Sequence, residues 1–173
     1  MNNSSLLSLI QNISLLLANA LIFDLVIKRK LKTASRLWQI PLGIVLGGGG
    51  IALMLTPWVF SEEIIFDTRS VLLAISGLFF GTIPTIIAMA IITTFRIIQG
   101  GVGALMGVGV ILTSGSIGLL WRHHLRSQLA SLSWWKLYLF GLLVHIVMLG
   151  CAFVMPLQTA LSVLSTIWLP VLF

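Results

Sequence analysis

The chain has 173 residues, of which 58% are hydrophobic and only 8% charged, and its mean hydropathy is +1.13. An ordinary soluble domain is about one quarter charged, so this composition excludes that class and indicates an integral membrane protein. The net charge of +6 would suggest nucleic acid in a soluble protein, but here the basic residues gather in short loops between apolar runs, so we expect a lipid bilayer and no nucleic acid as partner.

Apolar segments with the composition of transmembrane helices follow one another along the chain. They cover residues 5–27, 38–56, 68–81, 84–99, 102–121, 137–155 and 157–173. The predicted fold class is all-α, a polytopic membrane helical bundle of about six to seven spans with a short hairpin near residues 81–84. Residues 1–173 are expected to form a single transmembrane domain. The first segment has no basic region before it, so it is interpreted as an uncleaved helix rather than a signal peptide.

Two basic loops orient these segments. They occupy residues 28–36 and 122–136, and the positive-inside bias makes both cytoplasmic and the N-terminus external. Residues 68–99 could form one long span or two short ones, but a single span would place the two basic loops on opposite sides. The sequence therefore predicts a helical hairpin between 68–81 and 84–99. Gly81 can supply the chain reversal, and Pro84 is tolerated in the first turn of a helix.

Two arginines lie within the segments of this hairpin. Arg69 is 12 residues before Gly81 and Arg96 is 12 residues after Pro84. At about 1.5 Å per residue, each arginine is roughly 18 Å from the turn, so both are expected at one depth in the outer half of the membrane. An arginine at such a depth faces a protein interior or a wet cavity, usually with a partner. Two like charges at one level therefore predict an anion between them.

Neighbouring polar residues complete a candidate site for a small, anionic ligand. Asp67 and Thr68 precede Arg69, and Gln99 follows Arg96 with a side chain suited to a directed hydrogen bond. Thr93 and Thr94 are expected at the same level. Asp67 or Thr68 could instead cap the helix that starts there. In a purely structural alternative, the two arginines extend to lipid phosphates or brace the bundle through Asp67 and backbone carbonyls.

A glycine-rich stretch follows Arg96. Gly100 and Gly101 are expected to form the outer turn, and their amides could also contact an anion. The stretch resembles a dinucleotide-binding fingerprint but fails as one, because no β-strand precedes it and no acidic residue follows at the required distance. Close helix packing is the favoured interpretation of the small residues that follow, Gly103, Gly107, Gly115 and Gly118. The run Gly47–Gly50 is interpreted in the same way, with local unwinding as the alternative.

The sequence contains no catalytic constellation. It has no paired carboxylates, no nucleophile with a base and no cluster with metal-ligand spacing, so the chain alone is predicted not to be an enzyme and to need no cofactor or metal. The adjacent His123 and His124 would point about 100° apart on a helix and could not chelate one metal together. His145 and Cys151 lie six residues apart on one apolar segment and are expected to be buried and inert.

Three motifs together resemble a known family. They are FDTRSVLLAISGLFFG at 66–81, FRIIQGGVGALMGVGVIL at 95–112 and SIGLLWR at 116–122. The chain resembles, over roughly residues 15–173, the LytS/YhcK-type five-transmembrane receptor domain, or LYT sensor. The family's Asn/Asp-x-Arg motif matches Asp67-Thr68-Arg69, and its arginine followed by two glycines matches Arg96, Gly100 and Gly101. The segments drawn above exceed five, so the resemblance implies that either the first or the last segment is extra to the named core, or one short segment is re-entrant.

The resemblance implies a signal-sensing input domain in the bacterial plasma (inner) membrane. Such domains belong to sensor histidine kinases and diguanylate cyclases, so a cytoplasmic output domain is expected after residue 173 and a homodimer is implied. The alternative is a small-molecule-binding membrane subunit of a vitamin-type uptake transporter, although Ala18 and Ala20 do not match the Ala-x-x-x-Ala helix of those subunits. A purely structural membrane subunit is a third interpretation. The gene sequence beyond residue 173 would discriminate the sensor from the transporter.

Overall fold

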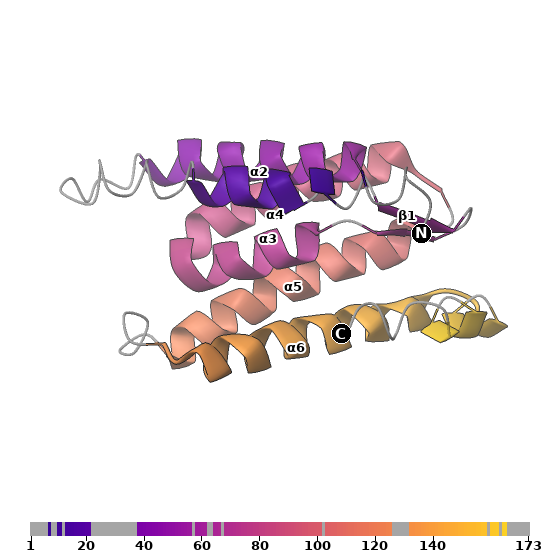
Figure 1. The fold of residues 1–173 in the computed structure, drawn as a ribbon. Helices are drawn as coiled ribbons and strands as arrows, with labels where there is room; N and C mark the ends of the chain where they lie inside the picture. Colours follow the sequence, from indigo (N-terminus) through magenta and orange to yellow (C-terminus); the bar gives the residue numbers. More distant parts are fainter. Residues whose placement is uncertain are drawn as a thin grey trace.

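The computed structural model describes a bundle of helices that run side by side with a short β-hairpin at one end (Figure 1). The described residues are 7, 10, 11, 13–21, 38–56, 58–61, 64–66, 68–101, 103–125, 132–158, 160–162, 164 and 165. The elements are α2 (Gln39–Leu55), β1 (Trp58–Ser61), β2 (Ile64–Phe66), α3 (Arg69–Ile75), the π-helix η2 (Ser76–Phe80), α4 (Thr82–Gln99), α5 (Ala104–His124), α6 (Trp134–Gly150) and the 3-10 helix η4 (Cys151–Val154).

The predicted fold class, a helical membrane bundle, is confirmed. Three helices are long and apolar enough to cross a membrane: Thr82–Gln99, Ala104–His124 and Trp134–Val154. Two shorter apolar helices, Gln39–Leu55 and Arg69–Phe80, correspond to the predicted segments 38–56 and 68–81. The predicted bounds of the later segments were less accurate, because α5 continues to His124 and α6 begins at Trp134. The predicted segments 5–27 and 157–173 and the loop at 28–36 lie partly or wholly outside the described residues.

The predicted hairpin between the third and fourth segments is confirmed. η2 ends at Phe80, Gly81 adopts a φ of +92°, and α4 starts at Thr82 with Pro84 in its first turn. This φ lies in the left-handed region, which glycine reaches without the steric penalty of a Cβ atom. The Thr85 hydroxyl donates a hydrogen bond to the Gly81 carbonyl at 2.7 Å and lies 3.1 Å from the buried Ser76 hydroxyl. These contacts fix the turn that joins the two helices.

Glycines on α2 let α4 approach closely. Gly43, Gly47 and Gly50 lie on one face of α2, where added Cβ atoms would collide with Ile87, Ile91 and Ile92 of α4. Because α2 is continuous through residues 47–50, the predicted packing role holds for Gly47 and Gly50, and unwinding does not occur. Gly48 faces open space, and Gly49 lies against Asn19 from the helical residues 13–21. The main hydrophobic core lies where α2, α3, α4 and α5 meet.

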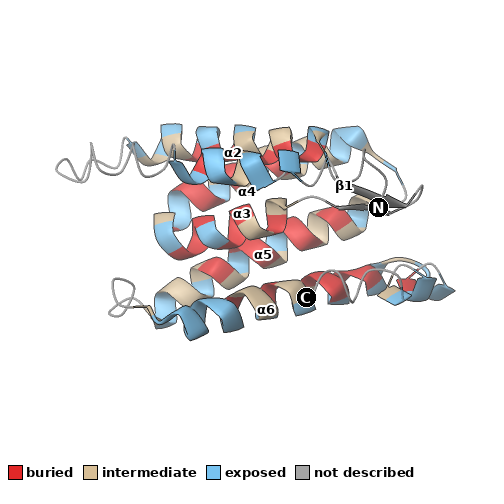
Figure 2. Ribbon diagram, viewed as in Figure 1, coloured by how far each residue is buried: buried red, intermediate tan, exposed pale blue. Residues whose placement is uncertain are grey.

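The crossing of α3 and η2 over α5 is a contact between backbones. A Cβ atom on Gly77 would lie 2.7 Å from the Leu119 nitrogen, and one on Gly118 would collide with the Ala74 carbonyl oxygen. The small face predicted on the fifth segment is therefore used at Gly118, while Gly115 accommodates Met89 of α4. α6 packs along α5 and α3 at the edge of the bundle, and its outward residues are exposed (Figure 2).

The connection between α2 and α3 contains secondary structure that the sequence analysis did not predict. β1 and β2 pair in antiparallel register, with Trp58 opposite Phe66, Val59 opposite Ile65, and an irregularity before Ser61. The residues are mostly β-branched and aromatic, types that favour strands. The hairpin lies at the end of the bundle where α4 passes into α5 (Figure 1). We call this the hairpin end and the opposite end, around the turn at Gly81, the Gly81 end.

Candidate functional site

Arg69 and Arg96 both lie at the hairpin end of the bundle. Arg69 is the first residue of α3, and Arg96 is in the last turn of α4. The chain reaches this arrangement because the two helices run in opposite directions from the turn at Gly81. Both side chains are half-buried. The two arginines therefore lie at the same end of the bundle, as predicted, close to the start of α5.

The two guanidinium groups converge on Gly107, in the first turn of α5. A Cβ atom at Gly107 would lie 2.5 Å from Arg96 Nε, 3.1 Å from Arg96 Cδ and 3.2 Å from Arg69 Nη2. Gly103, at the N-cap of α5, lies near Arg96 Nη2, which a Cβ there would meet at 3.6 Å. The atoms nearest to these two glycines thus belong to arginine side chains rather than to a neighbouring helix backbone. The absence of side chains at Gly103 and Gly107 makes room for both cations.

Arg96 is held by polar groups at the end of its own helix. Its Nη1 donates hydrogen bonds to Gln99 Oε1 and to the Gly100 carbonyl oxygen, both at 2.9 Å. Gln99 therefore directs its side-chain oxygen toward Arg96, as the sequence analysis placed it. Gly100 and Gly101 form the predicted turn, with φ values of +65° and +88°, and Cβ atoms on either would meet open space. These two hydrogen bonds therefore fix the Arg96 side chain, while the space beside Gly100 and Gly101 stays open.

The start of α5 adds further positive potential. The first amides of a helix carry partial positive charge and lack partners within the helix, and anions are stabilised there. The Ala104 amide donates to the Gly101 carbonyl and the Gly107 amide to the Gly103 carbonyl, so these two are satisfied locally. Two guanidinium groups beside a helix N-terminus form a region that favours an anion. Asp67, the predicted carboxylate, lies outside the described residues.

The other polar residues predicted near this level differ in role. Thr68 occupies the N-cap position of α3, but its side chain makes no capping hydrogen bond to the first turn. The Thr94 hydroxyl is exposed and donates to the Ala90 carbonyl of its own helix. The Thr93 hydroxyl, one turn before Arg96, is buried and has no hydrogen-bond partner among the described residues. Thr93 is therefore the hydroxyl with unused hydrogen-bonding capacity near the arginine pair.

Arg122 has a structural role that the sequence analysis missed. Its Nη1 donates hydrogen bonds to the Leu78 carbonyl at 3.1 Å and the Phe79 carbonyl at 2.8 Å, at the end of η2. Terminal carbonyls of a helix carry partial negative charge, so an arginine stabilises them. The sequence showed Arg122 only as part of a basic loop, because the contact joins residues more than 40 positions apart.

Candidate metal and redox groups remain isolated. His145 is half-buried and its Nδ1 lies 2.7 Å from the Gly141 carbonyl oxygen, while Cys151 is buried with its Sγ 3.7 Å from the Thr113 hydroxyl. His123 and His124 are exposed at the end of α5. Within the described part of the chain, no group of three His, Cys, Asp or Glu residues could hold a metal ion. The arginine pair is therefore the polar arrangement most suited to binding.

Comparison with known proteins identifies the family. The model of a family described as "5TMR of 5TMR-LYT" matches residues 20–173, nearly the whole chain. The chain belongs to this family. The 5TMR-LYT domain is a membrane sensory domain, so the chain is a multi-pass membrane protein of the sensory input class. The resemblance found in the sequence is thereby confirmed. No curated protein and no solved structure matches the chain.

Proposed function

We propose that this 5TMR-LYT domain is the input module of a bacterial sensor histidine kinase or diguanylate cyclase and binds a small anion between Arg69 and Arg96. The convergence of both guanidinium groups on Gly107 is the observation that carries the proposal. The anion would take hydrogen bonds from both arginines, and the glycine turn at 100–101 would admit it. Charge-assisted hydrogen bonds to arginine are about twice as strong as neutral ones, which suits a site within the membrane.

Binding changes the balance of charge at one end of the bundle. Without an anion, the two guanidinium groups repel each other across the space beside Gly107; with an anion, they are attracted to a shared partner. Because Arg69 begins α3 and Arg96 is in the last turn of α4, the ligand would draw the outer ends of these helices together. A ligand can shift the domain only if it binds one arrangement of the helices more tightly than the other.

The orientation follows from the basic loops. On the positive-inside rule, the Gly81 end faces the cytoplasm of a bacterial inner membrane, and the hairpin end with the arginine pair faces outward. A cytoplasmic output domain attached after residue 173 would receive the signal, and dimerisation of that domain would complete the receptor. A cysteine introduced at Lys136 in a cysteine-free background tests the orientation, since it should react with a membrane-impermeant thiol reagent only from the cytoplasmic side.

Ligand titration tests the site itself. The protein in lipid nanodiscs would be titrated with inorganic phosphate and a panel of small carboxylates, and binding would be followed by calorimetry. Arg69→Ala and Arg96→Ala should each weaken the anion that binds by about 10- to 100-fold, the range expected for one charged hydrogen bond. His124→Ala, which changes an exposed side chain at the other end of the bundle, is the control and should leave binding unchanged.

Two outcomes separate binding from bracing. If both arginine variants bind the same anions with unchanged affinity, the pair is not a ligand site. If instead both lower the thermal stability of the ligand-free protein and no tested anion stabilises the native protein, the arginines brace the bundle, as the structural alternative states. A sensor requires anion-dependent stabilisation that is lost in both variants and retained in the His124→Ala control.

A further inference from the structure

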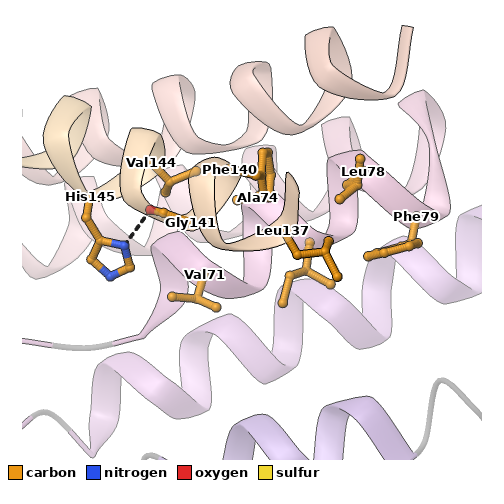
Figure 3. Close-up of a pocket in the computed structure, with 10 residues that line it drawn as sticks. Val71, Ala74, Leu78, Phe79, Leu137, Phe140, Gly141, Val144 and His145 are labelled. Carbon is orange, nitrogen blue, oxygen red and sulfur yellow. Dashed lines mark hydrogen bonds between the residues drawn. The ribbon is translucent and has the colours of Figure 1, made fainter. Parts of the chain in front are cut away.

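A cavity of about 300 Å³ separates α3 and η2 from α6 (Figure 3). Its floor is well buried and consists of Ala74, Leu78, Phe140 and Val144, each at most 4% exposed. Its rim lies at the surface of the bundle, since Ile75, Phe79 and Leu137 are each 38–39% exposed. The cavity is therefore open toward the surrounding membrane and is distinct from the arginine pair at the hairpin end.

The lining of this cavity cannot stabilise bound water. The surface that faces the cavity is entirely apolar, and a buried water needs two to four polar partners. His145 contributes its ring to one end, but its Nδ1 is engaged with the Gly141 carbonyl at 2.7 Å (Figure 3). An apolar void of this size is costly to leave empty, because the atoms around it lose their contacts. The occupant must be apolar.

The cavity is about as long as the hydrocarbon part of one membrane leaflet is thick, and it begins at one end of the bundle. On α6 the lining extends from Leu137 to His145, which is about 12 Å at 1.5 Å per residue. Half of a hydrocarbon layer about 30 Å thick is about 15 Å. The cavity starts close to the Gly81 end, since Leu137 is in the first turn of α6 and Phe79 directly precedes the end of η2. A chain that entered from the interface at this end would fill the cavity within a single leaflet.

Two basic residues lie near the cavity at its Gly81 end. Arg122 donates to the carbonyls of Leu78 and Phe79, which line the cavity, and Lys136 is adjacent to the lining residue Leu137. The segment 122–136 contains no acidic residue. Trp134 and Trp135 stack at 4.0 Å beside Lys136, in the manner of aromatic residues at a membrane interface. Basic residues at this position attract anionic lipid headgroups.

We propose that the cavity between α3, η2 and α6 binds an acyl chain of an anionic phospholipid from the leaflet at the Gly81 end. The chain lies along Ala74, Leu78, Phe140 and Val144, and the headgroup phosphate lies near Lys136 and Arg122. The lipid then completes the packing between α6 and the rest of the bundle. The proposal is independent of the anion site, because the cavity lies between α3 and α6, whereas Arg69 and Arg96 meet Gly107 of α5.

Photo-crosslinking with two matched glycine variants tests the proposal. An added Cβ atom at Gly141, which lines the cavity, meets open space, and so does one at Gly150, which lies on the same helix outside the cavity. Gly141→Phe should fill the cavity, whereas Gly150→Phe should not. The proteins would be reconstituted in phosphatidylethanolamine vesicles that contain phosphatidylglycerol with a diazirine on its acyl chain, and crosslinked peptides would be mapped by mass spectrometry.

The expected result is labelling of peptides covering residues 71–79 and 137–145 in the native protein and in Gly150→Phe, and its loss in Gly141→Phe. Gly141→Ala should give an intermediate reduction and guards against misfolding of the larger variant. A phosphatidylcholine probe with the same chain should label less, and Lys136→Gln should remove that difference. Equal labelling of the native protein and Gly141→Phe would overturn the site, and equal labelling by both lipids would overturn the anionic headgroup.

Discussion

Gly118→Ala is expected to separate α5 from α3. The new methyl group would collide with the Ala74 carbonyl oxygen and lie 3.0 Å from the Gly77 Cα atom. Carbon atoms in contact prefer about 3.5 to 4.0 Å, so the helices must move apart by about 0.5 Å or more. Overpacking of this kind costs about 1 to 3 kcal/mol. The gain from replacing glycine by alanine in a helix returns about 0.5 to 1 kcal/mol, which leaves a net loss of up to about 2.5 kcal/mol.

The control for this substitution lies on the same helix. A Cβ atom at Gly109 would lie 3.7 Å from Cys151 Sγ, an ordinary contact, so Gly109→Ala keeps the helix gain without the collision. Thermal unfolding in detergent, followed by far-UV circular dichroism, should show a lower midpoint for Gly118→Ala by about 2 to 4 °C per kcal/mol and an unchanged or higher midpoint for Gly109→Ala. Equal midpoints for the two variants would refute the proposed backbone contact.

Three other substitutions probe the site and the two ends of the bundle. Gly107→Ala should displace Arg96 and weaken anion binding by about tenfold or more, with little effect on the thermal midpoint, because a side chain rather than a backbone must move; calorimetry against Gly109→Ala checks this. Arg122→Met keeps the aliphatic stem but removes two charged hydrogen bonds, so the thermal midpoint should fall, at a cost of about 2 kcal/mol. Gly81→Ala places a Cβ atom at a φ of +92°, so denaturant unfolding should show a loss of about 1 to 2 kcal/mol; unchanged stability in either case would contradict the assigned role.

Composition, together with the requirement that both basic loops lie on the same side of the membrane, was sufficient to predict much of this fold. The apolar segments gave the helices of the bundle, and the positions of the basic loops required the reversal at Gly81 that the structure contains. Counting residues from that reversal placed Arg69 and Arg96 at one level, and both meet Gly107 in the structure. These predictions succeeded because the bilayer fixes the direction and length of each span, so one turn determines where residues on both sides of it lie.

Features that depend on contacts between distant segments were not predictable in this way. Gly107 and Gly118 were both interpreted as packing residues, yet one faces two arginines and the other faces a helix backbone. Which neighbour a glycine meets depends on helix rotation, which apolar sequence with little periodicity does not specify. The π-helical turn at Ser76–Phe80 and its contact with Arg122 were missed for a similar reason. The pattern of apolar residues does not show which backbone hydrogen bonds a helix makes.

The packing of α3 limits which helix can respond to a ligand under the proposed sensing function. At Gly77 and Gly118 the backbones of η2 and α5 touch, so sliding of α3 against α5 meets immediate steric resistance. On its other side α3 faces α6 across an apolar cavity, which is lined by side chains such as Phe140 rather than by a backbone contact. A force applied through Arg69 therefore meets less resistance toward α6 than toward α5. Displacement of α6 relative to the α3–α5 pair is therefore the movement that this packing favours.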